Sequence, residues 1–471
     1  MSASTEPLLD YANTVAYING RIYTINDSSP WAEAFIVSEN GYFSHVGSNH
    51  KIQQLASQHH IVTVDLKNQF VMPGVHDAHM HLLFSGLCLT SGAVIGMDAT
   101  HLDIASKIQQ GSCACEYINV YQDWILAAAY NNECFPNGVA DRKYLDALFP
   151  DRPVVVQGGA AYSMLLNTEA LKRAGYDIEN EPDTHAAKLS PAHVERTLKH
   201  AIGLAHKAGV TSTQEASSNT QLLTALSELE KEGDLKLDVS THVVYGCAWL
   251  ASESKDSLNQ LLDAVDHFKS KHVDTRFVKI VLDGVPLPPL LTHAGLGEHG
   301  HVDQSKIVTE DVADAVLKFD QLGCTVKIHC TGHGSTRLAF DAIEAARKVN
   351  PTGPRHEIAH NSGVHDDGYK RYAPFNVTAE ISPAELFTHP ITLASNALMD
   401  WNFPRMLASG AHITIGSDWG AVPDPSLFSA MASIVSTVGN GDKAKGGEML
   451  CRMFTLNGAI AVGKEKDQGK C

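Results

Sequence analysis

The sequence predicts an α/β protein with one large (β/α)8 barrel of the TIM type, a small β-sandwich-like domain and an insertion after the first barrel strand. Two observations lead to this fold class. Short runs of apolar or β-branched residues follow one another along the chain, and helical stretches separate several of them. The chain of 471 residues is also too long for one small domain, but it fits such a barrel with an accessory domain.

The first part of the chain predicts the small β domain. The segments TVAYINGRIYTIND and EAFIVSENGYFSHVG each place an Asn-Gly pair between two β-rich runs, at Asn19-Gly20 and Asn40-Gly41. Such a pair is the strongest short-range signal of a β-hairpin. The segment IVTVDLKNQFVM adds another pair of strands. We therefore expect a domain of residues 1–70 that consists of short strands joined by turns.

Residues 71–460 are predicted to form the barrel. Its eight strands are expected within residues 75–82, 210–215, 237–246, 276–284, 325–333, 356–361, 376–382 and 412–418. Helical periodicity lies between several of them, as in residues 309–323. Residues 84–195 contain helices and one strand candidate, residues 153–159, and we interpret them as an insertion. Residues 461–471 are predicted to be a short tail.

Composition and charge exclude several classes of partner. The net charge of −17 and the pI near 5.8 argue against nucleic acid or an anionic membrane surface. No apolar run reaches the length that a transmembrane helix needs. The N-terminal segment MSASTEPLLDYANT lacks a basic region followed by an apolar one, and the nine cysteines show no zinc-ribbon spacing. We therefore expect a cytoplasmic protein with reduced thiols.

Two histidines lie at the end of the first barrel strand. His79 and His81 are two residues apart, so both imidazoles point to the same side of a strand. Two neutral imidazoles directed at one point are a common beginning of a metal site. The alternative is a chance pair in a chain that contains 25 histidines.

Other side chains of the metal-binding type lie at the ends of further strands. These residues are Lys279, His329, His360 and Asp418. Taken singly, a histidine in an apolar strand is more often a core residue, a lysine an exposed residue and an aspartate a helix cap. In a (β/α)8 barrel, however, the C-terminal ends of the strands meet at one face, where active sites lie. Together with the histidine pair, they predict a metal centre that leaves a position open for water.

The chain resembles the amidohydrolase superfamily, and more closely its YtcJ-like branch, often called amidohydrolase family 3. The resembling segments, in family order, are NGRIYTIND, VMPGVHDAHMHL, DWILAAAYNN, LDALFPDRPVVV, NTEALKRAG, VKIVLDG, VKIHCTGHGSTRLAFDAIE, RHEIAHN and IGSDWG. They extend from about residue 16 to about residue 460. The HxH pair followed by Lys, His, His and Asp is a specific pattern, and the insertion after the first strand is typical of this branch.

The resemblance implies a role for each matching residue. The metal ligands that it implies are His79, His81, Lys279, His329, His360 and Asp418. Lys279 matches a lysine that carries a carboxylate from CO2 in binuclear members, because a carbamate can bridge two cations whereas an ammonium group cannot. Asp418 matches an aspartate that binds the metal and transfers a proton. The nitrogen and oxygen donors suit one or two divalent ions, Zn²⁺ above all, and do not exclude Fe²⁺ or Mn²⁺.

The implied reaction is hydrolysis of a C–N bond in a small-molecule substrate, such as an amide, an N-acyl or N-formyl amine, or a cyclic amide. A bound metal would acidify a water molecule, and Asp418 would act as general base and then as general acid. Two alternatives stay open. One is a metal-dependent lactone or ester hydrolase, or a lyase or isomerase, acting on a specialised metabolite. The other is a non-catalytic binding or regulatory protein on an inherited barrel.

Several positions depart from the pattern of the branch. His333 replaces an acid after the strand-five histidine, Ala359 replaces a glutamate before the strand-six histidine, and Tyr162 stands where a histidine is common. The usual substrates of the branch are therefore not implied here. We expect Tyr162, His333, Trp419 and His293 to contribute to substrate binding, with an ordinary surface role as the alternative for His293.

The C-terminal segment also departs from the family. Family members usually continue into strands that complete the small β domain, whereas this sequence reads AVGKEKDQGKC at that point. We therefore expect that domain to consist mostly of the N-terminal strands and to have an exposed edge, which proteins normally cover. One hypothesis is that a second copy covers it in a homodimer.

Overall fold

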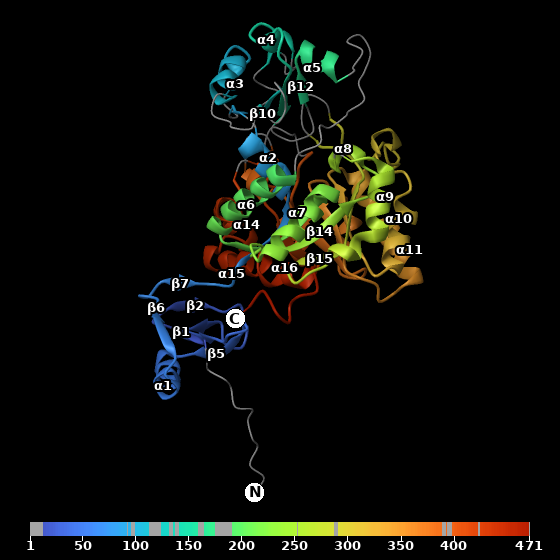
Figure 1. Ribbon diagram of the computed structural model, residues 1–471. Coiled ribbons are helices and arrows are strands. Elements are labelled where there is room, and N and C mark those ends of the chain that lie inside the picture. The colour runs from blue at the N-terminus through green and yellow to red at the C-terminus, as the bar shows by residue number, and fades with distance from the viewer. Residues whose placement is uncertain are drawn as a thin grey trace. The chain divides into compact units, whose positions relative to one another are not determined.

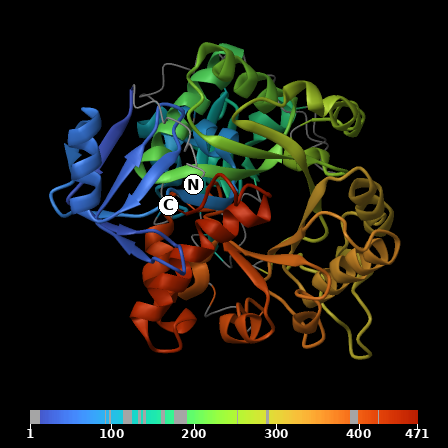
Figure 2. The ribbon, with the colours of Figure 1, turned by 90° about the horizontal axis from the view of Figure 1, so that it is seen from below.

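The computed structural model falls into two compact units, residues Met1–Val75 with Thr455–Cys471 and residues His76–Phe454. Figures 1 and 2 show the chain in two views. The residues that the structure describes are 13–91, 93–95, 99–112, 124–130, 135–136, 141–158, 164–174, 191–251, 253–286, 291–388, 392, 398–422 and 424–470.

The larger unit contains the predicted barrel. Its strands are β8 (Val75–Met80), β13 (Val210–Ser218), β14 (Asp238–Val244), β15 (Val273–Val281), β16 (Thr325–Cys330), β17 (His356–His360), β18 (Val377–Ile381) and β19 (His412–Ile415). They form an eight-stranded sheet in chain order from β19 back to β8, and the pairings from β13 to β19 are parallel. A bridge from Met80 to Trp419 joins the first strand to the segment after the last. The predicted fold class is confirmed.

Helices alternate with these strands, and those of this unit, coloured from green to red, surround the barrel (Figure 2). They are α7 (Thr220–Glu232), α8 (Ala248–Ala251), α9 (Lys255–Ala264), α10 (Val312–Gln321), α11 (His333–Val349), α13 (Phe403–Ala408), α14 (Leu427–Val438) and α15 (Lys443–Met453), with short 3₁₀ helices at Val265–Phe268, Gln304–Lys306, Gly368–Lys370 and Ala384–Thr388. Local sequence sets their ends. For example, the Asn219 side chain accepts a hydrogen bond from Leu222 N at the start of α7, and Gly233 ends that helix with a φ of 73°.

The insertion after β8 contains more strands than the sequence predicted. Its elements are α2 (Leu82–Ser91), β9 (Ala93–Val94), α3 (Ile104–Ser112), β10 (Ile125–Tyr130), α4 (Lys143–Asp146), β11 (Val154–Gly158), β12 (Met164–Leu166) and α5 (Thr168–Arg173), followed by α6 (Pro191–Lys207). One strand was expected, and the structure has a sheet in the order β12-β11-β10-β9. The expectation failed because β9 and β12 are very short and β10, ILAAAY, is rich in alanine, which favours helices.

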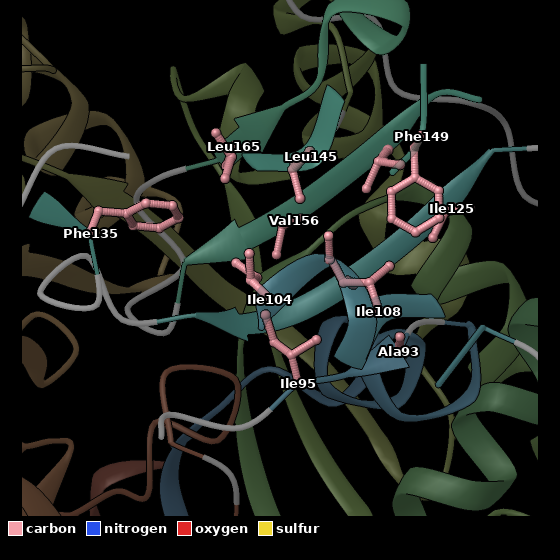
Figure 3. Packing of buried hydrophobic residues seen from close by; sticks show 13 residues of the cluster. Ala93, Ile95, Ile104, Ile108, Ile125, Phe135, Leu145, Phe149, Val156 and Leu165 are labelled. Atoms are coloured by element: carbon pink, nitrogen blue, oxygen red, sulfur yellow. The ribbon is translucent and has the colours of Figure 1, made fainter. Parts of the chain in front are cut away.

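A hydrophobic cluster holds this sheet against its helices (Figure 3). Val154 and Val156 of β11 and Ile125 of β10 are buried against Ile104 and Ile108 of α3. The two isoleucines are four residues apart, so they lie on one face of the helix, whereas the two valines are two apart and lie on one face of the strand. The inserted segment therefore has a core of its own.

The described residues of the smaller unit form two sheets and two helices. Its elements are β1 (Val15–Ile18), β2 (Arg21–Tyr23), β3 (Trp31–Ala32), β4 (Ala34–Val37), β5 (Phe43–Gly47), α1 (Asn49–His59), β6 (Val62–Asp65) and β7 (Phe70–Val71), together with α16 (Leu456–Ala461). The sheets have the orders β5-β4-β1-β6 and β3-β2-β7. Helix α1 packs on the larger sheet through Ile52 and Ala56. The sequence predicted only strands and turns in this part of the chain, so helix α1 was not expected.

One of the two predicted hairpins is present. Strands β4 and β5 pair antiparallel around Gly41, which has a φ of 85°. At Asn19-Gly20, by contrast, β1 pairs with β4 and β6 while β2 pairs with β3 and β7. The predicted hairpin there is wrong, because Asn19, with a φ of 57°, turns the chain from one sheet into the other. Strands β6 and β7 likewise lie in different sheets rather than as a pair.

In the part of the chain that the structure describes, no helix has both the length and the apolar composition that crossing a membrane requires.

Candidate metal centre

The histidine pair and the aspartate after the last strand face a common point. Nε2 of His81 lies 3.3 Å from Oδ1 of Asp418, and Nε2 of His79 lies 3.7 Å from the same oxygen. Candidate ligand atoms of the three side chains all lie within 4.8 Å of one another. Two main-chain hydrogen bonds fix this arrangement, from Asp418 N to His79 O at 2.7 Å and from His81 N to Trp419 O at 3.1 Å. Closure of the barrel therefore also assembles the cluster.

The remaining predicted ligands lie beside this cluster. Nζ of Lys279, in β15, is 3.3 Å from Nε2 of His79. The ring centroid of His360, the last residue of β17, is 4.7 Å from that of His79 and 4.3 Å from that of His329 in β16. Nδ1 of His360 is 3.9 Å from Oδ2 of Asp418. The structure thus brings all six predicted residues together at the C-terminal ends of the strands, as parallel strands of a barrel require.

Each imidazole is oriented through the nitrogen that points away from the cluster or along its edge. The contacts are His79 Nδ1 with Glu380 Oε2 (2.7 Å), His81 Nδ1 with Ser217 Oγ (2.7 Å), His360 Nδ1 with Ser382 O (3.0 Å) and His329 Nε2 with Gly284 O (2.9 Å). A main-chain carbonyl only accepts, so it holds the proton on the nitrogen that it contacts and leaves the lone pair on the other. Partners of this kind orient metal-binding histidines in proteins.

The side chains of the cluster offer donor atoms that suit a divalent cation. Nε2 of His360 is buried and has no hydrogen-bond partner among the described residues. Its other nitrogen already donates to the Ser382 carbonyl, so this atom carries a lone pair that only a cation or a donor would satisfy. Imidazole nitrogens and a carboxylate are donors that zinc and its neighbours prefer.

The protonation states favour metal binding. Burial and the charge of Lys279 hold the pKa of His79 well below its ordinary value, and burial and His360 do the same for His329. Burial lowers the pKa of His360 to about 4, although Asp418 opposes the shift. These imidazoles are therefore neutral near pH 7, which is the form that binds a metal.

Two further groups are charged or reactive at neutral pH. Burial raises the pKa of Asp418, but the hydrogen bond with His81 and the electrostatic influence of the neighbouring His360 and Lys279 outweigh it, so the net pKa is lowered. Burial and the nearby Lys327 lower the pKa of Lys279 to about 8, although Asp418 and Glu380 oppose this. The Asp418 side chain is therefore a carboxylate at neutral pH, and Lys279 loses its proton more readily than an ordinary lysine does.

Two residues of the cluster have an unusual backbone conformation. His360 and Asp418 have φ values of 70° and 53°, in the left-handed region that side chains other than glycine rarely adopt. The surroundings impose these conformations: Nε1 of the buried Trp401 donates to His360 O at 2.6 Å, and Asp418 N donates to His79 O. Both residues thus leave their strands in a direction that turns their side chains toward the cluster.

Several residues around the cluster were not identified from the sequence. Glu380 and Ser217 contact the histidine pair, and Glu215 accepts hydrogen bonds from Ser217 N at 3.0 Å and Leu82 N at 2.6 Å. The available signal was a charged residue inside an otherwise apolar strand, as in VTAEI, where every residue is buried. A charge in such a place needs a partner, but the sequence does not tell which one.

Asp283, which lies in the resembling segment VKIVLDG, organises the loops behind His329. It is buried and accepts hydrogen bonds from Ala294 N (2.9 Å), Thr331 N (3.0 Å), Gly332 N (2.9 Å) and Ser335 Oγ (2.7 Å). These donors come from the loop after β15, from the segment between β16 and α11 and from the first turn of α11. Burial raises the pKa of Asp283 to about 6 although these hydrogen bonds oppose the shift. The residue ties two active-face loops together.

The residues expected to bind substrate have different surroundings. His333 begins α11, and its ring lies 6.5 Å from that of His365. Burial lowers the pKa of the half-buried His293, and the charge of His333 lowers it further. Trp419 is only 2% exposed, and its main chain contacts β8. Tyr162 lies outside the described residues. Substrate binding by these residues stays a prediction.

Comparison with known proteins found relatives in sequence and in fold. The chain is 28% identical to YtcJ of Bacillus subtilis (strain 168) over 96% of its own length and 90% of the relative. It is 24% identical to the exoenzymes regulatory protein AepA of Pectobacterium carotovorum subsp. carotovorum, over 77% of this chain and 83% of that one. An uncharacterised metal-dependent hydrolase from Pyrococcus horikoshii OT3 has the same fold, with a TM-score of 0.71 at 19% identity over 97% of this chain and 94% of its own.

The family assignment rests on most of the sequence. The model of the amidohydrolase family matches residues 62–470, a range that contains the whole barrel, the insertion and all six residues of the cluster. Membership of this family indicates a hydrolase. The cluster of His79, His81 and Asp418, which the sequence had predicted, indicates a site for a divalent metal. The chain belongs to the amidohydrolase family.

Proposed function

We propose that the protein is a metal-dependent amidohydrolase that cleaves a C–N bond in a small molecule, such as an amide, an N-acyl or N-formyl amine, or a cyclic amide. The observation that supports this most directly is the convergence of neutral imidazoles, a carboxylate and a buried amine on one point at the active face of the barrel. Such a set fits a hydrolytic metal better than it fits a structural role, because an unoccupied cluster of buried polar groups is costly.

We propose Zn²⁺ as the metal, held by His79, His81 and Asp418 with His360 and His329 beside them. The nitrogen-rich donor set favours zinc over magnesium or calcium. Lys279 is the group that would allow a second ion. Its Nζ lies 3.3 Å from Nε2 of His79. The neutral amine can react with CO2, losing a proton to give a carbamate, which would supply anionic oxygens as metal ligands.

The residues of the cluster divide the proposed reaction among them. A divalent cation bound here would polarise the scissile carbonyl and acidify a water molecule. Asp418, a carboxylate at neutral pH, takes a proton as the water attacks, and the C–N bond then breaks as Asp418 returns that proton to the leaving nitrogen. The neutral histidines hold their lone pairs toward the centre throughout, because their outer nitrogens keep their hydrogen bonds.

The metal content of the purified chain tests the proposal first. We expect one or two equivalents of zinc, manganese or iron by elemental mass spectrometry, and their loss in the double variant His79→Ala/His81→Ala. The matched control is His299→Ala/His301→Ala, which has the same spacing but lies in an exposed loop, and which should keep its metal. A wild-type chain that binds no metal after supplementation would contradict the proposal.

The bond that is cleaved is tested with two substrate panels. We expect turnover in a panel of N-acyl and N-formyl amines and cyclic amides, and little in a panel of lactones and esters. Turnover confined to lactones would overturn the C–N assignment while leaving the metal site in place. Because one relative is named a regulatory protein, a metal-replete chain without turnover in either panel would favour a non-catalytic role.

We further propose that the protein forms a homodimer through β6, the edge strand of the four-stranded sheet. Val62 and Val64 of β6 are 67% and 40% exposed and lie in register with Val15 and Tyr17 of β1, so they extend an apolar face to an unpaired edge. Exposed edges of this kind are normally covered. In light scattering we expect a dimer for the wild type and a monomer for Val62→Lys/Val64→Lys, with Thr63→Lys, on the opposite face, unchanged. A strictly monomeric wild type would exclude this proposal.

A further inference from the structure

Glu380 occupies a special place among the groups that orient the four histidines. It lies in β18, a strand that contributes none of the six residues of the cluster, and its side chain is completely buried. Its Oε2 is 2.7 Å from Nδ1 of His79. The partners of the other three imidazoles are a serine hydroxyl and two main-chain carbonyls, so His79 is the one whose partner is a carboxylate.

The surrounding structure holds Glu380 in this place. Its main-chain carbonyl accepts a hydrogen bond from Asn361 Nδ2 at 2.9 Å, and Asn361 follows His360 directly. Gly416, in a neighbouring chain segment, has no side chain, and this leaves room for His79 and Glu380 to approach each other. A Cβ at Gly416 would lie 2.6 Å from Cβ of His79 and 2.8 Å from Oε1 of Glu380, closer than side chains allow. The close approach of these two side chains therefore requires a glycine at position 416, the first glycine of IGSDWG.

The geometry also determines which nitrogen of His79 is available. Nε2 lies 3.3 Å from Nζ of Lys279 and 3.7 Å from Oδ1 of Asp418, so it points into the cluster. Burial raises the pKa of Glu380 to about 8, although Lys327 and Lys279 oppose the shift. A cation bound to Nε2 would place the imidazole proton on Nδ1 and would favour the carboxylate form of Glu380, which accepts that proton. A carboxylate in this position fixes the ring and makes the opposite nitrogen a stronger donor.

We infer that Glu380 is a positioning residue that sets the affinity of the metal centre through His79. This inference rests on the proposed metal site but not on the reaction that the site catalyses. Removing the carboxylate leaves the His79 ring without its partner and with a weaker donor nitrogen. Comparable partners in other metal sites contribute about 10- to 100-fold in metal affinity.

The test compares metal dissociation constants rather than activity. Metal-free protein is titrated with Zn²⁺ in competition with a chelator, and the visible spectrum of Co²⁺ reports the geometry of the site. We expect the dissociation constant to rise about 10-fold in Glu380→Gln and by up to about 100-fold in Glu380→Ala, with an altered Co²⁺ spectrum in both. Glu380→Gln has nearly the same shape as the wild type, so it keeps the test valid if the alanine variant does not fold.

The matched control is Glu357→Gln. Glu357 lies in the adjacent strand β17 and is also completely buried, but its Oε2 pairs with Nζ of Lys327 at 3.1 Å. We expect this variant to lose thermal stability while its metal affinity and Co²⁺ spectrum stay within about twofold of the wild type. If both Glu380 variants bind metal as the wild type does, the inference is wrong and the proposed metal site stands. If the wild type itself binds no metal, the proposed function fails first.

Discussion

The variant Asp418→Asn is expected to lower kcat about 10³-fold on whichever amide of the panel is hydrolysed. The amide side chain keeps the shape of the carboxylate but cannot take a proton from water or return it to the leaving nitrogen. Loss of a general base typically costs about 10²- to 10⁴-fold in rate, and the mean of this range corresponds to about 4 kcal/mol in the barrier. The rate is measured at saturating zinc, with the metal content determined in parallel, because Asp418 is also a proposed ligand.

The control for this variant is Asp424→Asn, six residues later in the chain. Asp424 is exposed, and Oδ1 accepts a hydrogen bond from Ser426 N at 2.9 Å. We expect kcat to change by less than about twofold, because this carboxylate lies on the surface and only fixes a turn. An Asp418→Asn protein that carries its metal and turns over at the wild-type rate would refute the proton-transfer role.

The second large effect concerns stability. Replacing Asp320 by alanine is expected to lower the free energy of unfolding by about 3–5 kcal/mol, because the buried charge of Arg347 loses its carboxylate and keeps only main-chain carbonyl partners. Oδ2 of Asp320, in α10, accepts hydrogen bonds from Nη1 of Arg347 in α11 at 2.5 Å and from Nε2 of His356 in β17 at 2.9 Å. All three side chains are at least nine-tenths buried, with exposed fractions of 0%, 8% and 0%. Urea denaturation measures the loss.

An exposed ion pair with the same distance between nitrogen and oxygen provides the control. Nη1 of Arg405 lies 2.5 Å from Oδ1 of Asp366, but these side chains are 44% and 76% exposed. We expect Asp366→Ala to cost less than about 1 kcal/mol, because solvent screens the pair. Equal losses in the two variants would show that burial does not determine the strength of the Asp320 network.

The Asp320 network also predicts a pH dependence of stability. Burial raises the pKa of Asp320, but hydrogen bonds from His356, Arg347 and Asn350 outweigh it, so its folded-state pKa lies below the ordinary value of 3.8. The unfolded chain therefore binds this proton more readily than the folded one. The contribution of Asp320 to stability is complete above about pH 5 and is lost as the pH falls through the folded-state pKa. Asp320→Asn should remove this part of the acid sensitivity.

Much of the barrel could be predicted from the sequence, for a physical reason. Parallel strands in such a barrel are buried on both faces, so they appear as short apolar runs between helices, as in RFVKIVLDG and HITIGSD. Once the strands are placed, their C-terminal ends must meet. That rule brought His79, Lys279 and Asp418 together before any distance was known, although they are about 140 to 340 residues apart in the chain.

Other features depended on contacts that leave little trace in a single sequence. The Asn19-Gly20 pair has the local signature of a hairpin, but tertiary packing leads the two strands into different sheets. Strand β10 has helix-favouring composition and is a strand because its neighbours β9 and β11 pair with it. In both places local preference is worth about 1 kcal/mol or less per residue, and burial and pairing outweigh it.

The sequence by itself determined the fold class and predicted the residues of the candidate metal site, because periodicity and strand ends are local properties of the chain. Only the tertiary structure decided how the site is held. It placed Glu380 against His79, 301 residues away in sequence, and Ser217 against His81, 136 residues away. The choice of the nitrogen that carries each lone pair follows from these partners. A hydrogen bond depends on distances of a few tenths of an ångström between distant segments, and those distances exist only after the barrel has closed.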